Sequence, residues 1–205
     1  RHYFTEKGIL LEGIPEKDSE FLLSLHKKKT AIFIEMIESG ILPLRAGVKR
    51  LMTIGVNAKT SARAVKLAKS HFEIYASVGV HPHDATSCSD AVLSDLIKLA
   101  ATPEVRDWGE IGLDFNRMYS PRQDQEQWFQ RQLHAALAMN LPIIFHERDT
   151  NGRFLKLLKA HPDPARRGVV HCFSGTGQEL EQYLSLGFLI GITGILTIAS
   201  RGKDL

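Results

Sequence analysis

The sequence places imidazole or carboxylate side chains at the carboxyl ends of four successive apolar runs. These side chains belong to His81, His83, Glu110, Asp114, His146 and His171. Imidazole and carboxylate donors together suit a borderline divalent ion such as Zn²⁺ or Mn²⁺, and Mg²⁺ is less favoured as the number of nitrogen donors rises. The residue types therefore predict a divalent-metal site.

Three of these residues, Glu110, His146 and His171, are separated by intervals that each match one strand-plus-helix step. In a parallel barrel, side chains at the carboxyl ends of the strands project into a common mouth, so that fold would bring the three together. A single histidine at a strand end is more often a hydrogen-bonded structural residue than a ligand. The three taken together favour a site.

From residue 50 onward, short β-branched runs alternate with segments of helical period, which is typical of βα units around a parallel sheet. The sequence Ser120-Pro121 predicts the start of the helix that carries Phe129. This periodicity fits a parallel barrel and an open doubly wound α/β sheet equally well. We expect six strands, over Leu51–Val56, Tyr75–Val80, Val105–Leu113, Pro142–Glu147, Gly168–Phe173 and Phe188–Gly194.

The length of the chain bounds its organisation. With 205 residues we expect a single domain, with an atypical segment over residues 1–45, helical over 16–40, and a barrel-like core over residues 46–205. A complete (β/α)₈ barrel typically needs about 250 residues. For a barrel, six strands would mean that the first and last strands are missing or altered.

The net charge and the number of cysteines exclude few classes of function. The net charge of +3 at pH 7 suits a polyanionic substrate but is far below that of a dedicated nucleic-acid binder. Two cysteines without metal-finger spacing suit a reducing cytosol, and we expect a cytoplasmic protein without a signal peptide. The apolar stretch over residues 187–199 would span about 20 Å as a helix, too short for a bilayer core of about 30 Å.

Six blocks of sequence carry most of the chemistry-bearing and glycine residues. They are GVKRLMTIG (47–55), VGVHPHD (78–84), GEIGLD (109–114), LPIIFHERD (141–149), HCFSG (171–175) and GFLIGITG (187–194). In this order they resemble the successive signatures of the TatD family of deoxyribonucleases. The resemblance runs over about three quarters of the chain.

This resemblance implies a TIM-type (β/α) barrel of the amidohydrolase-like type that uses one or two divalent metal ions, Mg²⁺, Mn²⁺ or Zn²⁺. It also implies exonucleolytic cleavage of phosphodiester bonds in DNA that is single-stranded or end-containing. Such an ion lowers the pKa of a water toward about 7 and neutralises charge on phosphoryl oxygens. By position, the implied metal ligands are Glu110, His146 and His171, with Glu110 also catalytic, and the implied phosphate contacts are His81, His83 and Arg148.

Two of the site residues have alternative interpretations. Asp114 either orients a metal ligand, which would make it part of the catalytic machinery, or caps a loop or helix. Arg148 either contacts phosphate or forms a local ion pair with Asp149 at the start of the next helix.

The sequence departs from the TatD family pattern at two places. The family's first strand carries a His-x-His pair that supplies two metal ligands, and no such pair occurs before His81 in this sequence. The family also supplies an aspartate from a Thr-Asp-Ser-Pro-like block, and no such block occurs up to Leu205. These departures leave open a non-catalytic or truncated relative, or a related barrel hydrolase of a small ester, lactone or cyclic amide.

Two weaker signals concern single side chains near the predicted ligands. Trp108 could stack a nucleic-acid base or pack between strand and helix. Alternation along the strand that carries His171 points Cys172 to the opposite face, which predicts a buried thiol that is not a nucleophile.

Overall fold

The computed structural model describes residues 28, 31–32, 35, 47–161 and 167–194. The chain divides into two compact units, Arg1–Val48 and Lys49–Leu205. All strands of the described residues belong to the second unit. The helical segment expected over residues 16–40 lies outside the described residues, except at four helical positions, Lys28, Ala31, Ile32 and Glu35.

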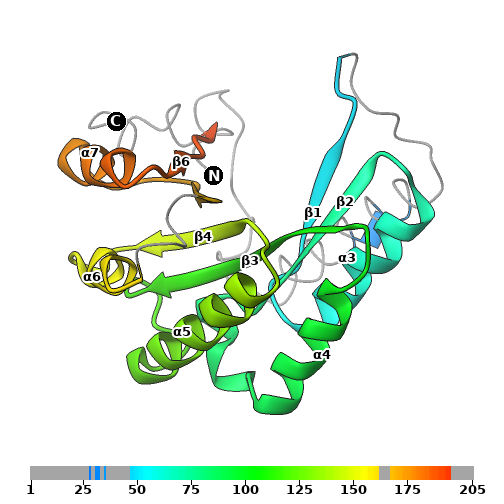
Figure 1. The fold of residues 1–205 in the computed structure, drawn as a ribbon, viewed down its shortest axis with the longest axis horizontal. Coiled ribbons are helices and arrows are strands. Elements are labelled where there is room, and N and C mark those ends of the chain that lie inside the picture. The colour runs from blue at the N-terminus through cyan, green and yellow to red at the C-terminus, as the bar shows by residue number, and fades with distance from the viewer. Residues whose placement is uncertain (1–27, 29–30, 33–34, 36–46, 162–166, 195–205) are drawn as a thin grey trace, which may run out of the picture. The chain divides into compact units, whose positions relative to one another are not determined.

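Within the described residues, six parallel strands form one curled sheet whose spatial order follows the sequence (Figure 1). A doubly wound sheet would reverse its strand order part-way, so that alternative is excluded. The half-barrel of alternating strands and helices confirms the TIM-type α/β prediction with parallel strands. The strands are β1 (Leu51–Ile54), β2 (Ile74–Val78), β3 (Val105–Asp114), β4 (Ile143–Arg148), β5 (Gly168–His171) and β6 (Leu189–Ile190).

The helices follow one another around the outside of the curled sheet (Figure 1). As predicted, one of them begins directly after Ser120-Pro121. None of the helices in the described part of the chain is both long and apolar enough to cross a bilayer. The helices are α3 (Ala58–Ser70), the 3₁₀ helix η1 (Pro82–Ser87), α4 (Asp90–Ala100), α5 (Arg122–Ala138), α6 (Arg153–Lys159) and α7 (Gly177–Ser185).

The core lies between the sheet and these helices. On α5, Phe129 and Leu133 are both fully buried, whereas Leu137, one turn further along, is exposed. On α7, Leu184 is exposed while Tyr183 is buried. Tyr183 takes the buried position because its ring packs edge-on against Phe188, 5.9 Å away, where the chain turns back into the sheet.

Gly112 allows β3 and β4 to approach closely at the carboxyl end of the sheet. A Cβ at this position would lie 1.8 Å from the carbonyl oxygen of His146, and the backbone φ of 153° disfavours any side chain. Because no side chain intervenes, the two strands stay in register as far as the pair Asp114 and Arg148. The glycine therefore fixes the distance between the two strands that carry most of the predicted site.

Candidate metal centre

The carboxyl ends of neighbouring strands bring the predicted metal ligands to one rim of the sheet. Gly112 pairs with His146, and His146 pairs with His171, in the parallel registers of β3, β4 and β5. Glu110 lies two residues before Gly112, and its Oε1 lies 3.3 Å from His146 Nδ1. Glu110, His146 and His171 therefore come from three adjacent strands, but in the described part of the chain the donor atoms that lie within 4.8 Å of one another are those of His81, His83 and His146.

Asp114 is the centre of a hydrogen-bond network at this rim. Its Oδ2 lies 2.7 Å from His83 Nε2 and 3.1 Å from His146 Nε2. Its Oδ1 accepts hydrogen bonds from the backbone N–H groups of Asn116, at 3.0 Å, and Arg117, at 2.8 Å. One oxygen thus contacts two imidazoles, and the other caps the loop that follows β3.

His146 contacts two carboxylates through its two ring nitrogens. Nδ1 lies 3.3 Å from Glu110 Oε1, and Nε2 contacts Asp114. Burial lowers the pKa of His146, but the hydrogen bonds to Asp114 and Glu110 outweigh burial and raise the pKa to about 9. Burial raises the pKa of Glu110, but the hydrogen bond and charge of His146 bring it below its ordinary value. The surroundings favour positive charge between the two carboxylates, which a divalent cation would also supply.

His81, His83 and His146 form a second set of nitrogen donors. One ring nitrogen of each lies within 4.8 Å of the others. Burial and, to a smaller extent, the neighbouring His146 lower the pKa of His81 to about 3. The His81 ring is therefore neutral, and its one acceptor nitrogen, Nδ1, accepts a hydrogen bond from the His83 backbone N–H at 3.1 Å. Three imidazoles suit a borderline divalent ion, and the sequence spacing did not predict this grouping.

His171 ends β5, and its Nε2 lies 3.1 Å from Cys172 Sγ. The prediction that Cys172 is buried on the opposite face is wrong, because the strand stops at His171 and Cys172 adopts a left-handed conformation with φ of 53°. The half-buried thiol therefore lies beside the imidazole instead of pointing away from it. Burial raises the pKa of Cys172, which keeps the thiol protonated and argues against a nucleophilic role.

The surroundings of β3 and β4 bear on the alternatives that the sequence left open for Arg148 and for Trp108. Asp149 accepts a hydrogen bond from Asn116 Nδ2 at 2.6 Å, and the described residues contain no ion pair between Arg148 and Asp149. Arg148 is half-buried at the end of β4, where it pairs in register with Asp114. Trp108 is fully buried, so it packs inside the fold and cannot stack a base.

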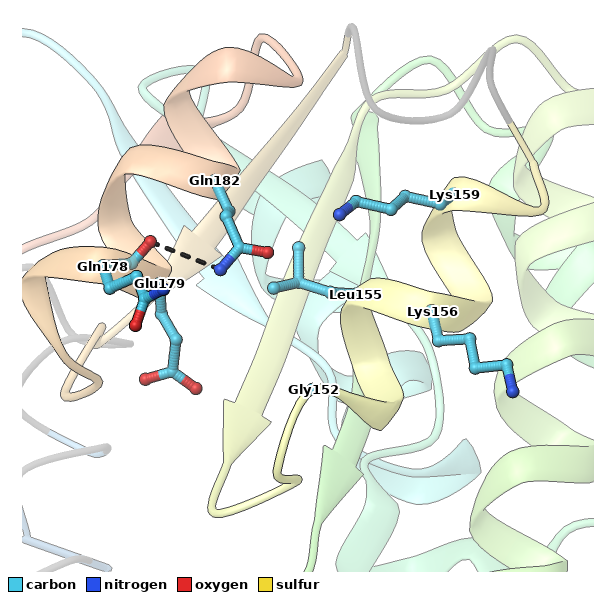
Figure 2. Close-up of a pocket in the computed structure, with 7 residues that line it drawn as sticks. All are labelled: Gly152, Leu155, Lys156, Lys159, Gln178, Glu179 and Gln182. Carbon is cyan, nitrogen blue, oxygen red and sulfur yellow. Dashed lines mark hydrogen bonds between the residues drawn. The ribbon is translucent and has the colours of Figure 1, made fainter.

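Two hollows lie next to the rim, in the part of the chain that follows β4. One, of about 410 Å³, lies between α6 and α7, where Leu155, Lys159 and Gln182 point into it and Lys156 points away (Figure 2). The other, of about 450 Å³, lies between the loops after β4 and β5 and has an acidic lining that includes Glu147. None of the candidate imidazoles lines either hollow. The rings of His81, His83 and His146 instead contact one another, with centroids 4.2 to 5.9 Å apart.

Sequence reasoning missed two buried glutamines on α5 that hold the backbone of the rim. Gln125 accepts a hydrogen bond from the Asp114 N–H at 2.8 Å and donates to the Asp114 carbonyl at 3.1 Å. Gln132 holds Val80, the residue before His81, in the same manner, at 2.7 Å and 3.0 Å. The pairing of β2 with β3 ends at Val78 and Trp108. The side-chain amides therefore replace the missing strand partner.

A signal for these glutamines exists in the sequence. Gln125 and Gln132 stand seven residues apart on the same helix face as Phe129. Two polar residues on an apolar stripe must find hydrogen-bond partners, because buried polar groups are seldom left unpaired.

The chain matches the family model described as TatD related DNase over residues 37–205. This chain belongs to the TatD family. The TatD relatives include the 3'-5' ssDNA/RNA exonuclease TatD of Shigella flexneri and that of Escherichia coli K12, each 41% identical over 160 residues. Those alignments cover 78% of this chain and 62% of each relative, so the chain spans less than two thirds of the curated relatives it matches.

Solved TatD structures share the half-barrel. The E. coli TatD homolog YJJV aligns with a TM-score of 0.69 at 35% identity, covering 75% of this chain and 60% of that one. A TatD family hydrolase from Entamoeba histolytica aligns with a TM-score of 0.68 at 27% identity, covering 73% and 53%. The six strands described above are thus a recognisable part of the family's barrel.

Proposed function

We propose that the protein is a divalent-metal-dependent hydrolase that cleaves phosphodiester bonds in DNA, acting as an exonuclease on single-stranded or end-containing substrates. The observation that carries the proposal is the position of His146 between Glu110 and Asp114 at the rim of a TatD half-barrel. The names of the most similar relatives, which act on ssDNA and RNA, support the substrate class.

The residues that would hold the ion in this proposal are Glu110, His146 and His171. Their carboxylate and imidazole donors fit Mn²⁺ or Zn²⁺, and Mg²⁺ with fewer nitrogen ligands. A bound divalent ion supplies a Lewis acid that acidifies water and neutralises charge on phosphoryl oxygens. The cluster of His81, His83 and His146 supports an alternative metal-binding site, which shares His146 with the site formed by Glu110, His146 and His171.

The remaining site residues act on ligand geometry and on the substrate. Asp114 fixes the rings of His83 and His146 through one oxygen, as carboxylates behind metal-binding histidines commonly do. The side chain of His83 is 28% exposed, so it can reach a phosphate at the rim. Arg148 adds a permanent positive charge with two parallel donors suited to phosphate oxygens.

The test measures metal binding and cleavage separately. Metal content and calorimetric affinity for Mn²⁺ and Zn²⁺ are compared between the wild type, Glu110→Ala, His171→Ala and His81→Ala. We expect the first two variants to lose most of the bound metal while keeping the fold. Loss in His81→Ala with retention in His171→Ala would move the ion to the three-histidine cluster.

Cleavage is then followed on a 3'-labelled and a 5'-labelled single-stranded DNA oligonucleotide, with Mg²⁺ or Mn²⁺ and with chelator as control. Chelator-sensitive shortening from one end is the expected result, and an RNA oligonucleotide of the same sequence tests the second polymer. Metal binding without cleavage of either polymer would contradict the nuclease and favour a non-catalytic relative or a hydrolase of small esters or cyclic amides.

A further inference from the structure

An aromatic side chain that the proposed mechanism does not use stands next to the proposed phosphate contact. Tyr119 lies in the loop between β3 and α5, and 64% of its surface is exposed. Its ring meets the His83 ring edge to face, with centroids 4.8 Å apart. A large aromatic ring left in solvent at the mouth of a site is available for a flat ligand.

The loop that carries Tyr119 is held at both ends. At its start, the backbone N–H groups of Asn116 and Arg117 donate to Asp114. At its end, the Arg122 guanidinium lies 4.4 Å over the ring of Phe115, which packs on the core. Arg117 Nη1 also donates to the Tyr119 hydroxyl at 3.2 Å. The ring is therefore positioned by the same carboxylate that holds His83.

We propose that Tyr119 is a stacking surface for a nucleobase of the single strand whose phosphate contacts His83. This inference rests on the proposed function and adds the base-binding part of the substrate site. In a nucleotide, the base and its phosphate are separated by one sugar, a distance that the 4.8 Å between the two rings can accommodate. Stacking on an aromatic ring is independent of base identity, because every base has a π face.

The surroundings of Tyr119 agree with a nucleic-acid ligand. Arg117 brings a cation to the Tyr119 hydroxyl, and Arg122, the first residue of α5, places a second cation over Phe115 of the same loop. Met118, between Arg117 and Tyr119, is 41% exposed and adds apolar surface. An aromatic ring interleaved with basic residues is the usual composition of a site for single-stranded nucleic acid. Trp108, for which the sequence left base stacking and packing open, is buried.

The experiment measures binding of a fluorescent single-stranded DNA oligonucleotide in chelator, where cleavage cannot occur, and then KM and kcat with Mn²⁺. We expect Tyr119→Ala to weaken binding and raise KM about tenfold with little change in kcat, and Tyr119→Phe to stay within about twofold of the wild type. Phe72→Ala is the matched control. Phe72 is 88% exposed, and it precedes β2 at the opposite end of the sheet.

A second substrate identifies stacking as the cause. An oligonucleotide with an abasic site next to its 3' end should bind the wild type about tenfold more weakly than the intact strand, and Tyr119→Ala should not distinguish the two. Equal losses for intact and abasic strands, or wild-type affinity in Tyr119→Ala, would overturn the stacking role. So would a loss in Tyr119→Phe equal to that in Tyr119→Ala.

Failure of the nuclease proposal gives a different result. A wild type that binds the strand but never cleaves it would contradict the proposed function, and the comparison of intact and abasic strands in chelator would still decide the role of Tyr119. A wild type that binds no single strand would overturn both proposals, because a stacking surface beside a phosphate contact must retain the strand.

Discussion

The middle of the rim and its edge hold their candidate ligands differently. In the middle, β3 and β4 are 10 and 6 residues long, and Asp114 and His146 each make several hydrogen bonds. At the edge, β5 and β6 have 4 and 2 residues, and His171 contacts the thiol of its own neighbour. Hydrogen bonds within the protein therefore orient the candidate ligand His146 in the middle, whereas the position of His171 depends on the register of a short strand.

The largest expected difference between these regions concerns the backbone. Gly112→Ala places a Cβ against the His146 carbonyl, so we expect a loss of about 4 kcal/mol in the free energy of unfolding, or failure to fold. Gly187→Ala, before the edge strand β6, has a φ of 88° but open space, and should cost about 1 kcal/mol. Urea unfolding of both variants tests this, and equal losses would contradict the close approach described at Gly112.

The second prediction concerns the pH dependence of stability in the middle of the rim. The pKa of His146 is about 9 in the folded state and about 6.5 in an unfolded chain, so its charged form stabilises the fold. In chelator, this contribution is complete below pH 6.5 and is lost as the pH rises to 9, a decrease of about 3 kcal/mol.

Urea unfolding in chelator at pH 6.5 and pH 9 measures that decrease. His146→Gln should remove it, because no group at this position then titrates. Asp114→Asn should reduce it, because it removes one of the two carboxylates that raise the pKa of His146. An unchanged decrease in both variants would show that another group is responsible.

A smaller effect is expected from the amide that supports Asp114. Gln125→Met keeps the volume but leaves the backbone N–H and carbonyl of Asp114 without a partner. Disturbed support of a metal-binding histidine usually costs 10-fold or more in metal affinity, and we expect about tenfold here by calorimetry with Mn²⁺. Gln127→Met is the matched control, since Gln127 is exposed on the same helix. If excess Mn²⁺ restores the activity of Gln125→Met, the variant has lost the positioning of Asp114 and not the stability of the whole fold.

The smallest expected effect concerns Arg148, the proposed phosphate contact at the end of β4. Arg148→Ala removes one proposed phosphate contact, so binding of single-stranded DNA in chelator should weaken about fivefold at low salt. The slope of log affinity against log salt concentration should fall by about 0.7. Arg167→Ala is the control, because Arg167 precedes β5 at the other end of the sheet. A salt dependence identical to that of the wild type would remove Arg148 from the substrate site.

Much of this site could be predicted from the sequence because its chemistry follows the strands. Each apolar run from β2 to β5 ends within a few residues of its expected boundary, and the following polar residues reach one rim as parallel strands require. The periodicity could not separate a barrel from a doubly wound sheet, because both bury strands on both faces. The observed spatial order of the strands supplies that distinction.

The parts that the sequence did not predict depend on partners far apart in the chain. Gln132 bonds a backbone that lies 52 residues away, and no local pattern identifies that partner. The contact of Tyr119 with His83 likewise depends on how the loop after β3 folds back. The error at Cys172 has a local cause, since a left-handed residue at a strand end interrupts the alternation on which the prediction relied.

The single oxygen that Asp114 offers to two imidazoles links the two halves of the site thermodynamically. A ligand that draws His146 away from Oδ2 leaves His83 as the sole ring contact of that atom, and a ligand that draws His83 away does the same for His146. A ligand bound at one imidazole thus changes the free energy of ligand binding at the other imidazole. Because such linkage is reciprocal, an ion held through His146 and a phosphate held through His83 must alter each other's affinity by the same factor.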